Sequence, residues 1–212
     1  MIEISNAFKI NVDEDLKGSV VLAKKLYLEG SIFIYPTDTI YGIGANPFNE
    51  KAVKKIEDIK GRKEDKKNIL LINNIENLLK YVDIPSEKYL DFLLAIWPNP
   101  VSVILNLNKK FKKILNTSNA AFRIPNHRFC LKLLDELKMP LISTSVNKSN
   151  NPSINEPSLI FEEFSDIIDN IFYCTKKNFQ VASTLIDLTG IKPKILRQGK
   201  INVDGMIDKY LL

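Results

Sequence analysis

Side chains that can bind anions gather in three separate stretches of this chain. The triplet Thr37-Asp38-Thr39 follows an apolar run that ends at Pro36, a basic stretch runs from Lys60 to Lys67, and a stretch rich in hydroxyls and amides covers 143–153. Guanidinium and ammonium groups pair with carboxylates and phosphates, and short hydroxyls bind the oxygens of such groups. The three stretches together favour a site for a nucleotide or another anionic ligand.

Arginine is scarce in this sequence. Of the 30 basic residues only Arg62, Arg123, Arg128 and Arg197 are arginine, so lysine supplies most of the positive charge. The planar guanidinium can bind a carboxylate or a phosphate through two parallel hydrogen bonds, which lysine cannot do. Each arginine is therefore a candidate for binding such a group.

Phosphate binding by a glycine-rich loop is not indicated. The chain has eight glycines and no GxxxxGK[ST] motif, so side chains rather than backbone amides would have to hold the phosphates of a nucleotide. Taken separately, the basic stretch is typical of a solvated surface, and a hydroxyl cluster after a strand is typical of a turn.

Short apolar runs alternate with helical patterns along the chain. This alternation predicts an α/β domain with a twisted mixed sheet and flanking helices, because the closely spaced late strands can pair antiparallel. Asp13 is the candidate cap of the first helix, and Gly30 and Gly61 end the first two helices. The predicted strands are 31–36, 68–72, 101–107, 120–124, 141–145, 171–174, 184–188 and 194–197, and the predicted helices are 13–29, 49–60, 74–82, 86–97, 128–138 and 157–168.

Length and composition favour one globular domain over residues 1–212. The chain is 45% apolar and 26% charged, which is ordinary for a folded protein. No apolar run reaches the roughly 20 residues that cross a bilayer, and the acidic start is untypical of a targeting peptide, so we expect a cytoplasmic protein without a membrane contact. Cys130 and Cys174 are expected to be buried thiols, since their spacing fits neither a zinc site nor a disulfide framework.

Seven segments occur in the order typical of one known family. The chain resembles the YrdC/TsaC family of threonylcarbamoyl-AMP synthases, in its short single-domain form, over nearly its whole length. The matching segments are IYPTDTIYGIGANP (34–47), KGRKEDKKNILLI (60–72), WPNPVSVIL (97–105), FRIPNH (122–127), LISTSVN (141–147), STLIDL (183–188) and ILRQG (195–199).

The resemblance implies a concave, basic ligand groove and a role for particular residues. Lys60 and Arg62 would form the catalytic KxR element, and Ser145 with Asn147 the SxN element. The implied threonine site is Thr39, Arg123, Ser143 and Ser183, and the implied ATP site is Arg62, Lys66, Asn119, Ser145, Asn147, Ser153 and Arg197, with no metal ligand from the protein.

The implied reaction is a nucleotidyl transfer. The amine of L-threonine takes up CO₂ or bicarbonate, and the resulting carbamate attacks the α-phosphate of ATP and expels pyrophosphate. Mg²⁺ would be carried by the nucleotide, and proteins that transfer the threonylcarbamoyl group to tRNA would take the product. A weak contact with tRNA is compatible with this activity.

Three features need separate interpretation. Leu71 stands where some family members have a histidine, which would alter part of the threonine contact. The stretch 106–119 is a candidate mobile loop beside Arg123, because it has many lysines and few structural signals. His127, the single histidine, follows a loop proline and is expected at the surface or at a helix cap.

Three alternative functions stay open. An RNA-binding module of the same fold without catalysis would need a broad field of positive charge and exposed aromatic rings; the net charge of +5 is compatible with it, but Phe33, Tyr35, Phe122 and Phe172 lie in apolar runs typical of a core. A carbamoyltransferase that forms carbamoyl-AMP would carry further, cysteine-rich domains. A domain that has lost its activity is disfavoured by the intact KxR and SxN elements.

Overall fold

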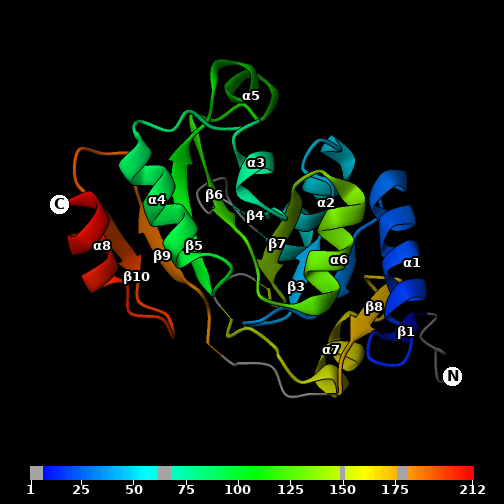
Figure 1. Ribbon diagram of the computed structural model, residues 1–212. Coiled ribbons are helices and arrows are strands. Elements are labelled where there is room, and N and C mark those ends of the chain that lie inside the picture. The colour runs from blue at the N-terminus through cyan, green and yellow to red at the C-terminus, as the bar shows by residue number, and fades with distance from the viewer. Residues whose placement is uncertain (1–6, 62–67, 149–150, 176–180) are drawn as a thin grey trace, which may run out of the picture.

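The structure is a computed structural model that describes residues 7–61, 68–148, 151–175 and 181–212. Figure 1 shows these residues as one central sheet with helices around it. The strands are β1 (Phe8–Asn11), β2 (Phe33–Tyr35), β3 (Gly42–Gly44), β4 (Ile69–Leu71), β5 (Val101–Asn106), β6 (Asn119–Arg123), β7 (Leu141–Ser145), β8 (Asn170–Tyr173), β9 (Thr184–Asp187) and β10 (Lys194–Arg197). The helices are α1 (Leu16–Glu29), α2 (Glu50–Lys60), α3 (Ile75–Leu78), α4 (Glu87–Ile96), α5 (Lys109–Ile114), α6 (Arg128–Leu137), α7 (Pro157–Phe164) and α8 (Asp204–Leu211).

The described strands form one ten-stranded mixed sheet in the order β1-β8-β2-β3-β7-β4-β6-β5-β9-β10. Strand β8 pairs parallel with β1 and β2, β4 pairs parallel with β6, and β5 pairs parallel with β9. The late strands β9 and β10 pair antiparallel. The predicted α/β class with a mixed sheet and flanking helices is confirmed.

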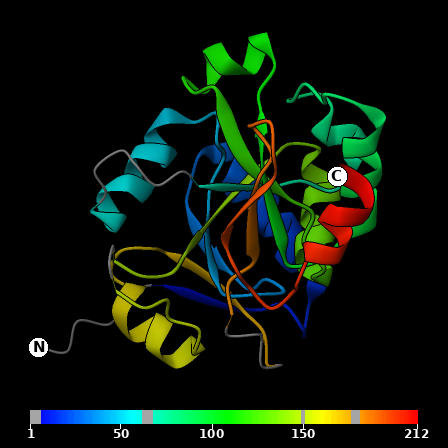
Figure 2. The same cartoon turned by 90° about the vertical axis from the view of Figure 1, so that its left-hand side faces the viewer.

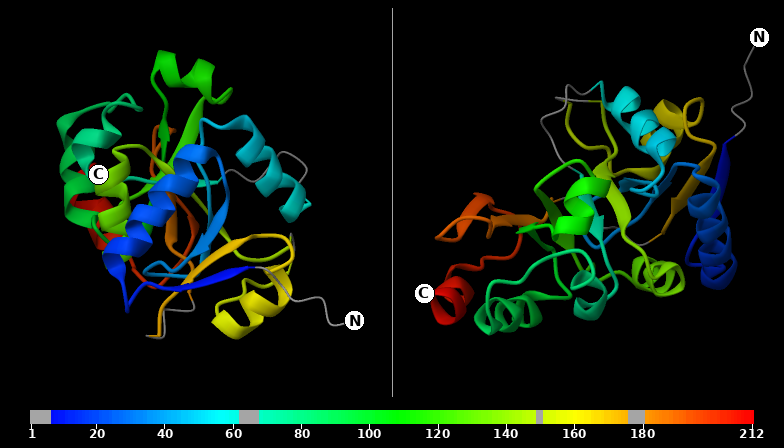
Figure 3. Two further views of the ribbon diagram at one scale, coloured as in Figure 1. Left: turned by 90° about the vertical axis from the view of Figure 1, so that its right-hand side faces the viewer. Right: turned by 90° about the horizontal axis from the view of Figure 1, so that it is seen from above.

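The helices cover the sheet unequally. In Figures 2 and 3 helices α1, α4, α6 and α8 lie along one side of the sheet, whereas α2 and α7 lie on the other. Helix α1 packs on α6, and α4 packs on α8. The side with α2 and α7 is the more open one.

Aromatic rings fill the core beneath α6. Phe129 of α6 lies 5.3 Å, centroid to centroid, from Phe172 of β8, which in turn lies 5.6 Å from Phe33 of β2. Phe33, Tyr35, Phe92, Phe122 and Phe172 are all fully buried. The prediction that these aromatics are core residues is confirmed, so none of these five rings is free to stack on nucleic-acid bases.

Most helix ends follow the sequence signals. Gly30 and Gly61 take left-handed conformations at the ends of α1 and α2, as predicted. The cap of α1 differs from the prediction, because the Asp15 carboxylate accepts a hydrogen bond from the Gly18 amide at 2.8 Å. The carboxylate of Asp13 instead accepts hydrogen bonds from the amide and hydroxyl of Thr175.

The stretch 106–119, expected as a mobile loop, contains helix α5, so the expectation of a loop is corrected while its mobility stays a prediction. The Asn108 side chain caps this helix by accepting from the Phe111 amide at 3.1 Å. The Phe111 ring packs edge-on against Tyr81 at 4.6 Å and near Phe48 at 5.9 Å. One anchoring aromatic residue among four lysines gives too weak a periodic pattern to be recognised in the sequence.

Other elements also escaped the sequence patterns. Strands β1 and β3 span only four and three residues, and the predicted strand list lacks both of them and helix α8. Both ends of β3 are glycine, which has low strand propensity. Among the described residues, no helix has the length and apolar character that a membrane span requires.

Candidate functional site

A pocket of about 260 Å³ lies on one face of the sheet, over β7, β4 and β6. The β-sheet register pairs Ser143 of β7 with Ile69 of β4, and Ile69 with Ala121 of β6. Side chains two residues apart in a strand share a face, so Arg123 projects on the same side as Ala121. Ser143, Ile69 and Arg123 accordingly line the same pocket although they are distant in sequence.

Strands β3 and β7 lie close together along the wall of the pocket that Ser143 and Ser145 form. Gly42 of β3 pairs with Ser145 of β7. A Cβ atom at Gly42 would lie 2.8 Å from the Ser143 Oγ, a distance that real Cβ atoms do not adopt. Glycine at this position leaves the Ser143 hydroxyl its place in the pocket.

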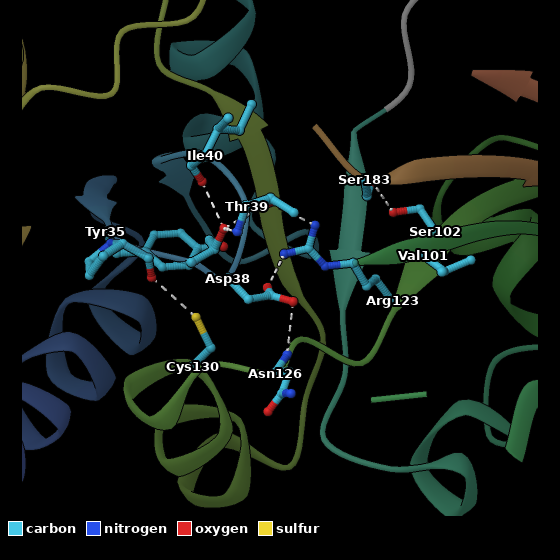
Figure 4. Close-up of polar contacts among 12 residues, drawn as sticks. Tyr35, Asp38, Thr39, Ile40, Val101, Ser102, Arg123, Asn126, Cys130 and Ser183 are labelled. Carbon is cyan, nitrogen blue, oxygen red and sulfur yellow. Dashed lines mark hydrogen bonds and ion pairs between the residues drawn. The ribbon is translucent and has the colours of Figure 1, made fainter. Parts of the chain in front are cut away.

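Arg123 is held from two sides at the base of the pocket (Figure 4). One terminal nitrogen donates to the Asp38 carboxylate at 2.6 Å, and the other donates to the Thr39 hydroxyl at 3.0 Å. The second oxygen of Asp38 accepts from the Asn126 amide at 3.0 Å. The side chains of Arg123 and Asp38 are only 4% and 5% exposed, so the pair is a buried ion pair with a fixed orientation.

The Nε nitrogen of this guanidinium is the one that makes no hydrogen bond within the described structure. Arg123 Nε is buried, and among the described residues it has no hydrogen-bond partner. A buried N–H without a partner costs about 1–3 kcal/mol, more when it is charged. The Nε–H is therefore available to an acceptor on a ligand.

Arg197 approaches the pocket from β10. Its Nε donates to the Ser183 carbonyl at 2.9 Å, and a terminal nitrogen donates to the Ser183 hydroxyl at 3.2 Å. Gly199 permits this approach, since a Cβ there would lie 2.3 Å from the Thr184 backbone nitrogen. Burial, and then the charge of Arg123, lowers the pKa of Arg197, which remains a strong base.

Lys60 lies behind the pocket wall at the end of α2 and is 1% exposed. Its ammonium group donates to the Ser145 carbonyl at 2.7 Å, to the Ser145 hydroxyl at 3.2 Å and to the Asn147 side-chain oxygen. The Ser145 hydroxyl donates to the same Asn147 oxygen at 2.6 Å. Residues 85 and 87 positions apart in sequence are thus joined in one cluster.

The structure brings most of the candidate residues together. Eight of them line the one pocket, namely Thr39, Arg123, Ser143, Ser145, Asn147, Ser153, Ser183 and Arg197. Arg62 and Lys66 lie outside the described residues. Asn119, at the start of β6, lines a separate depression of about 500 Å³ between α2 and the end of α5.

Two residues of this site are not among the candidates that the sequence predicts. Asp38 stands out in the sequence only as part of its triplet, although a carboxylate between two threonines in a chain with few arginines is a signal for an ion pair. Ser102 of β5 lies 2.8 Å from the Ser183 hydroxyl and is fully buried, and nothing in the run VSVILNL singles it out.

The structure places Leu71 in the sheet beside Arg123 and His127 at the start of α6. Leu71 pairs with Arg123 in the β-sheet register, is fully buried and is not part of the pocket lining among the described residues. His127 occupies the cap position of α6 but makes no side-chain cap hydrogen bond, and its Nδ1 is buried without a partner in the described structure. The expected position at a helix cap is confirmed for His127, but the cap is made without a side-chain hydrogen bond and the residue is only partly exposed.

The pocket has the electrostatic character of an anion site. Its described lining contains two arginines, several hydroxyls and one amide, and neither Asp nor Glu. The fold and this site define an α/β protein with a ten-stranded mixed sheet and a half-buried pocket suited to anionic ligands.

Comparison with known proteins identifies the family. Residues 25–199 match the Sua5/YciO/YrdC family model, which carries the description "Telomere recombination". The chain belongs to this family. A threonylcarbamoyl-AMP synthase from Pyrococcus abyssi (strain GE5 / Orsay) is 32% identical over 199 residues, which is 92% of this chain and 58% of that protein.

Solved structures show the same fold. P. abyssi Sua5 complexed with L-threonine superposes with a TM-score of 0.85 at 29% identity, covering 95% of this chain and 60% of that one. YciO of E. coli superposes with a TM-score of 0.85 at 22% identity, covering 96% of this chain and 100% of that one. The chain thus spans about three fifths of its P. abyssi relative and the whole length of YciO.

Proposed function

We propose that this chain is an L-threonylcarbamoyladenylate synthase, a nucleotidyltransferase that makes threonylcarbamoyl-AMP and pyrophosphate from L-threonine, bicarbonate or CO₂, and ATP. The proposal assigns the activity to one domain of residues 1–212. Family membership and the names of the relatives support this activity. The site residues argue for it independently.

The observation that carries the proposal is the buried Arg123, whose Nε–H has no partner among the described residues. A free amino acid presents a carboxylate, which accepts charge-assisted hydrogen bonds from a guanidinium. Thr39, Ser143 and Ser183 line the same pocket and can bind the other polar groups of such a ligand. These four residues constitute the proposed threonine site.

ATP would occupy the part of the pocket near the SxN element. Ser145, Asn147 and Ser153 offer hydroxyl and amide groups there, and Arg197 supplies a positive charge. Lys60 adds a second charge from behind the wall and holds Ser145 and Asn147 in place. From the family resemblance we also assign Arg62, Lys66 and Asn119 to the ATP site, which would then extend to the separate depression that Asn119 lines.

No side-chain nucleophile is needed for the reaction. The threonine nitrogen bonds to the carbon of CO₂ and loses a proton, and an oxygen of the resulting carbamate attacks the α-phosphorus. The bond from that phosphorus to the bridging oxygen breaks, and pyrophosphate leaves with the electron pair. The protein contributes positioning and charge neutralisation, which are effective when both reactants are held in line.

Magnesium would not be bound by the protein itself. Mg²⁺ prefers carboxylate ligands, and the described lining of the pocket contains no carboxylate. The Asp38 carboxylate, which is not part of this lining, already binds Arg123 and Asn126. The ion would enter with the phosphates of ATP.

In this proposal the product serves tRNA threonylcarbamoyladenosine formation in the cytoplasm, where ATP and tRNA are found. Threonylcarbamoyl-transfer proteins would be the downstream partners, and contact with tRNA would be weak.

The test is pyrophosphate release from ATP and Mg²⁺, with L-threonine or bicarbonate omitted in turn. We expect release only when both are present, loss of release in Arg62→Ala, and an Arg123→Lys variant whose KM for threonine rises roughly 10- to 100-fold, because lysine cannot replace the guanidinium hydrogen bonds. Lys25→Ala, which removes an exposed charge of α1, is the control.

Release of pyrophosphate without threonine would contradict the proposed substrate. Absence of release with intact ATP binding, together with salt-sensitive RNA binding, would favour the RNA-binding module instead.

A further inference from the structure

Two fully buried hydroxyl residues stand directly behind the pocket wall. Thr37 contacts Thr39, and Ser102 contacts Ser183, yet neither Thr37 nor Ser102 lines the pocket. Figure 4 shows the Ser102–Ser183 pair on one side of Arg123 and Thr39 on the other. A hydroxyl has one proton to donate, so the partners of these buried residues determine what Ser183 and Thr39 can offer a ligand.

The direction of the Ser102–Ser183 hydrogen bond follows from burial. Ser102 is 0% exposed, and within the described structure its hydroxyl has one partner, the Ser183 Oγ at 2.8 Å. If Ser183 donated, the Ser102 proton would be buried without an acceptor, which is unfavourable. Ser102 therefore donates, and Ser183 accepts from both Ser102 and Arg197.

Since both lone pairs of Ser183 are then occupied, its own proton is left without an acceptor in the described part of the chain. The Ser183 hydroxyl lines the pocket, so it presents a donor to the ligand.

The opposite polarity results at Thr39. The Thr37 hydroxyl is 2.7 Å from the Ile40 carbonyl, which can only accept, so the Thr37 proton is committed there. In the 3.0 Å contact between the two threonines the donor must therefore be Thr39. Thr39 also accepts from Arg123, which leaves it one lone pair and no proton for the ligand.

We propose that Ser102 and Thr37 are positioning residues that fix the hydrogen-bond polarity of the pocket, with Ser183 as a donor and Thr39 as an acceptor. An α-amino acid fits this polarity in one orientation. Its carboxylate lies toward Ser183 and the Arg123 Nε–H, and an N–H or O–H of the ligand points to Thr39. Naming the ligand as an amino acid rests on the proposed function, whereas the polarity follows from the buried hydroxyls alone.

The first test measures L-threonine by calorimetry and by steady-state kinetics in Ser102→Ala, Ser183→Ala and the double variant. We expect Ser102→Ala to weaken threonine binding roughly three- to tenfold, since one hydrogen bond is involved, and to raise KM with little change in kcat. In the Ser183→Ala background the same change should have no further effect.

A matched control separates this from a general loss of structure. Ser19→Ala removes another buried serine hydroxyl, on α1, which lacks a partner in the described structure, and should leave threonine binding unchanged. Equal losses from Ser102→Ala with and without Ser183, or no loss at all, would overturn the role of Ser102.

A neutron structure of the unliganded protein decides the polarity whether or not threonine is the substrate. Deuterons placed from Ser102 toward Ser183 and from Thr39 toward Thr37 are the expected result, and either deuteron in the reverse direction would overturn the proposal. Absence of threonine-dependent pyrophosphate release would instead refute the proposed function while leaving this result intact.

Discussion

At the scale of single residues, the site depends on the orientation of one guanidinium. Arg123 is buried, and the charge that compensates it comes from Asp38, 85 positions earlier in the chain. Asp38 in turn is fixed by the Asn126 amide. The ion pair leaves the Nε–H of Arg123 without a partner in the described structure, so Asp38 acts on a ligand through Arg123.

Replacing Asp38 by asparagine should uncouple this arrangement. Asp38→Asn keeps the shape but leaves the Arg123 charge buried without compensation, and we expect a loss of about 3–5 kcal/mol in the free energy of unfolding. Urea denaturation measures this change. Asp58→Asn, which disrupts an exposed pair with Lys54, should change stability by no more than about 0.5 kcal/mol; equal effects of the two variants would contradict a structural role for the buried pair.

At the scale of elements, helix α5 illustrates order imposed by a single contact. A helix of six residues has little stability of its own, and this one carries four exposed lysines. The Asn108 cap and the packing of Phe111 on Tyr81 hold it against the body of the protein.

Removing the anchor should release the helix without unfolding the domain. In Phe111→Ala we expect faster hydrogen exchange at the amides of Lys112 and Leu115, which donate to Asn108 and Phe111 carbonyls, because the helix loses its tertiary contact. Exchange in β5 and β6 should be unaffected. Ile114→Ala, at a side chain 50% exposed, is the control, and unchanged exchange in Phe111→Ala would show that the anchor lies elsewhere.

At the scale of the whole molecule, one partly buried imidazole links stability to pH. Burial lowers the pKa of His127 below its usual 6.5, and the charge of Arg123 acts in the same direction, although Asp38 and Asp13 oppose the shift. A histidine whose pKa is lower in the folded state stabilises the fold only while it is neutral.

The free energy of unfolding should therefore fall as the pH drops below about 6.5, because the unfolded chain binds the proton first, and this contribution should level off below the pKa of the folded state. His127→Gln should remove the dependence that begins as the pH falls through about 6.5, leaving the carboxylate titrations at lower pH. Urea unfolding of both proteins across this range measures the difference. Parallel curves for the two proteins would contradict a lowered pKa.

The sequence by itself determined the fold class, most of the elements and the types of residue in the site. Short apolar runs identify β2, β5 and β7, because the residues of a buried strand are consecutive in the sequence and mostly apolar. The glycines after α1 and α2 identify the helix ends, because helices often end in a left-handed residue and glycine adopts this conformation most easily. Scarcity of arginine selects Arg123 and Arg197, and the segment order indicates the family.

Only the tertiary structure decided which groups meet and what each one offers a ligand. Strand order and register place β7, β4 and β6 side by side, so that Ser143 and Arg123 share a pocket, and no local pattern encodes that pairing. The same holds for the Asp38–Arg123 ion pair and for Ser102 behind Ser183, since burial and hydrogen-bond direction are properties of neighbours distant in the chain. Short elements such as β3 and α5 also depend on these contacts, because their own residues are insufficient to stabilise them.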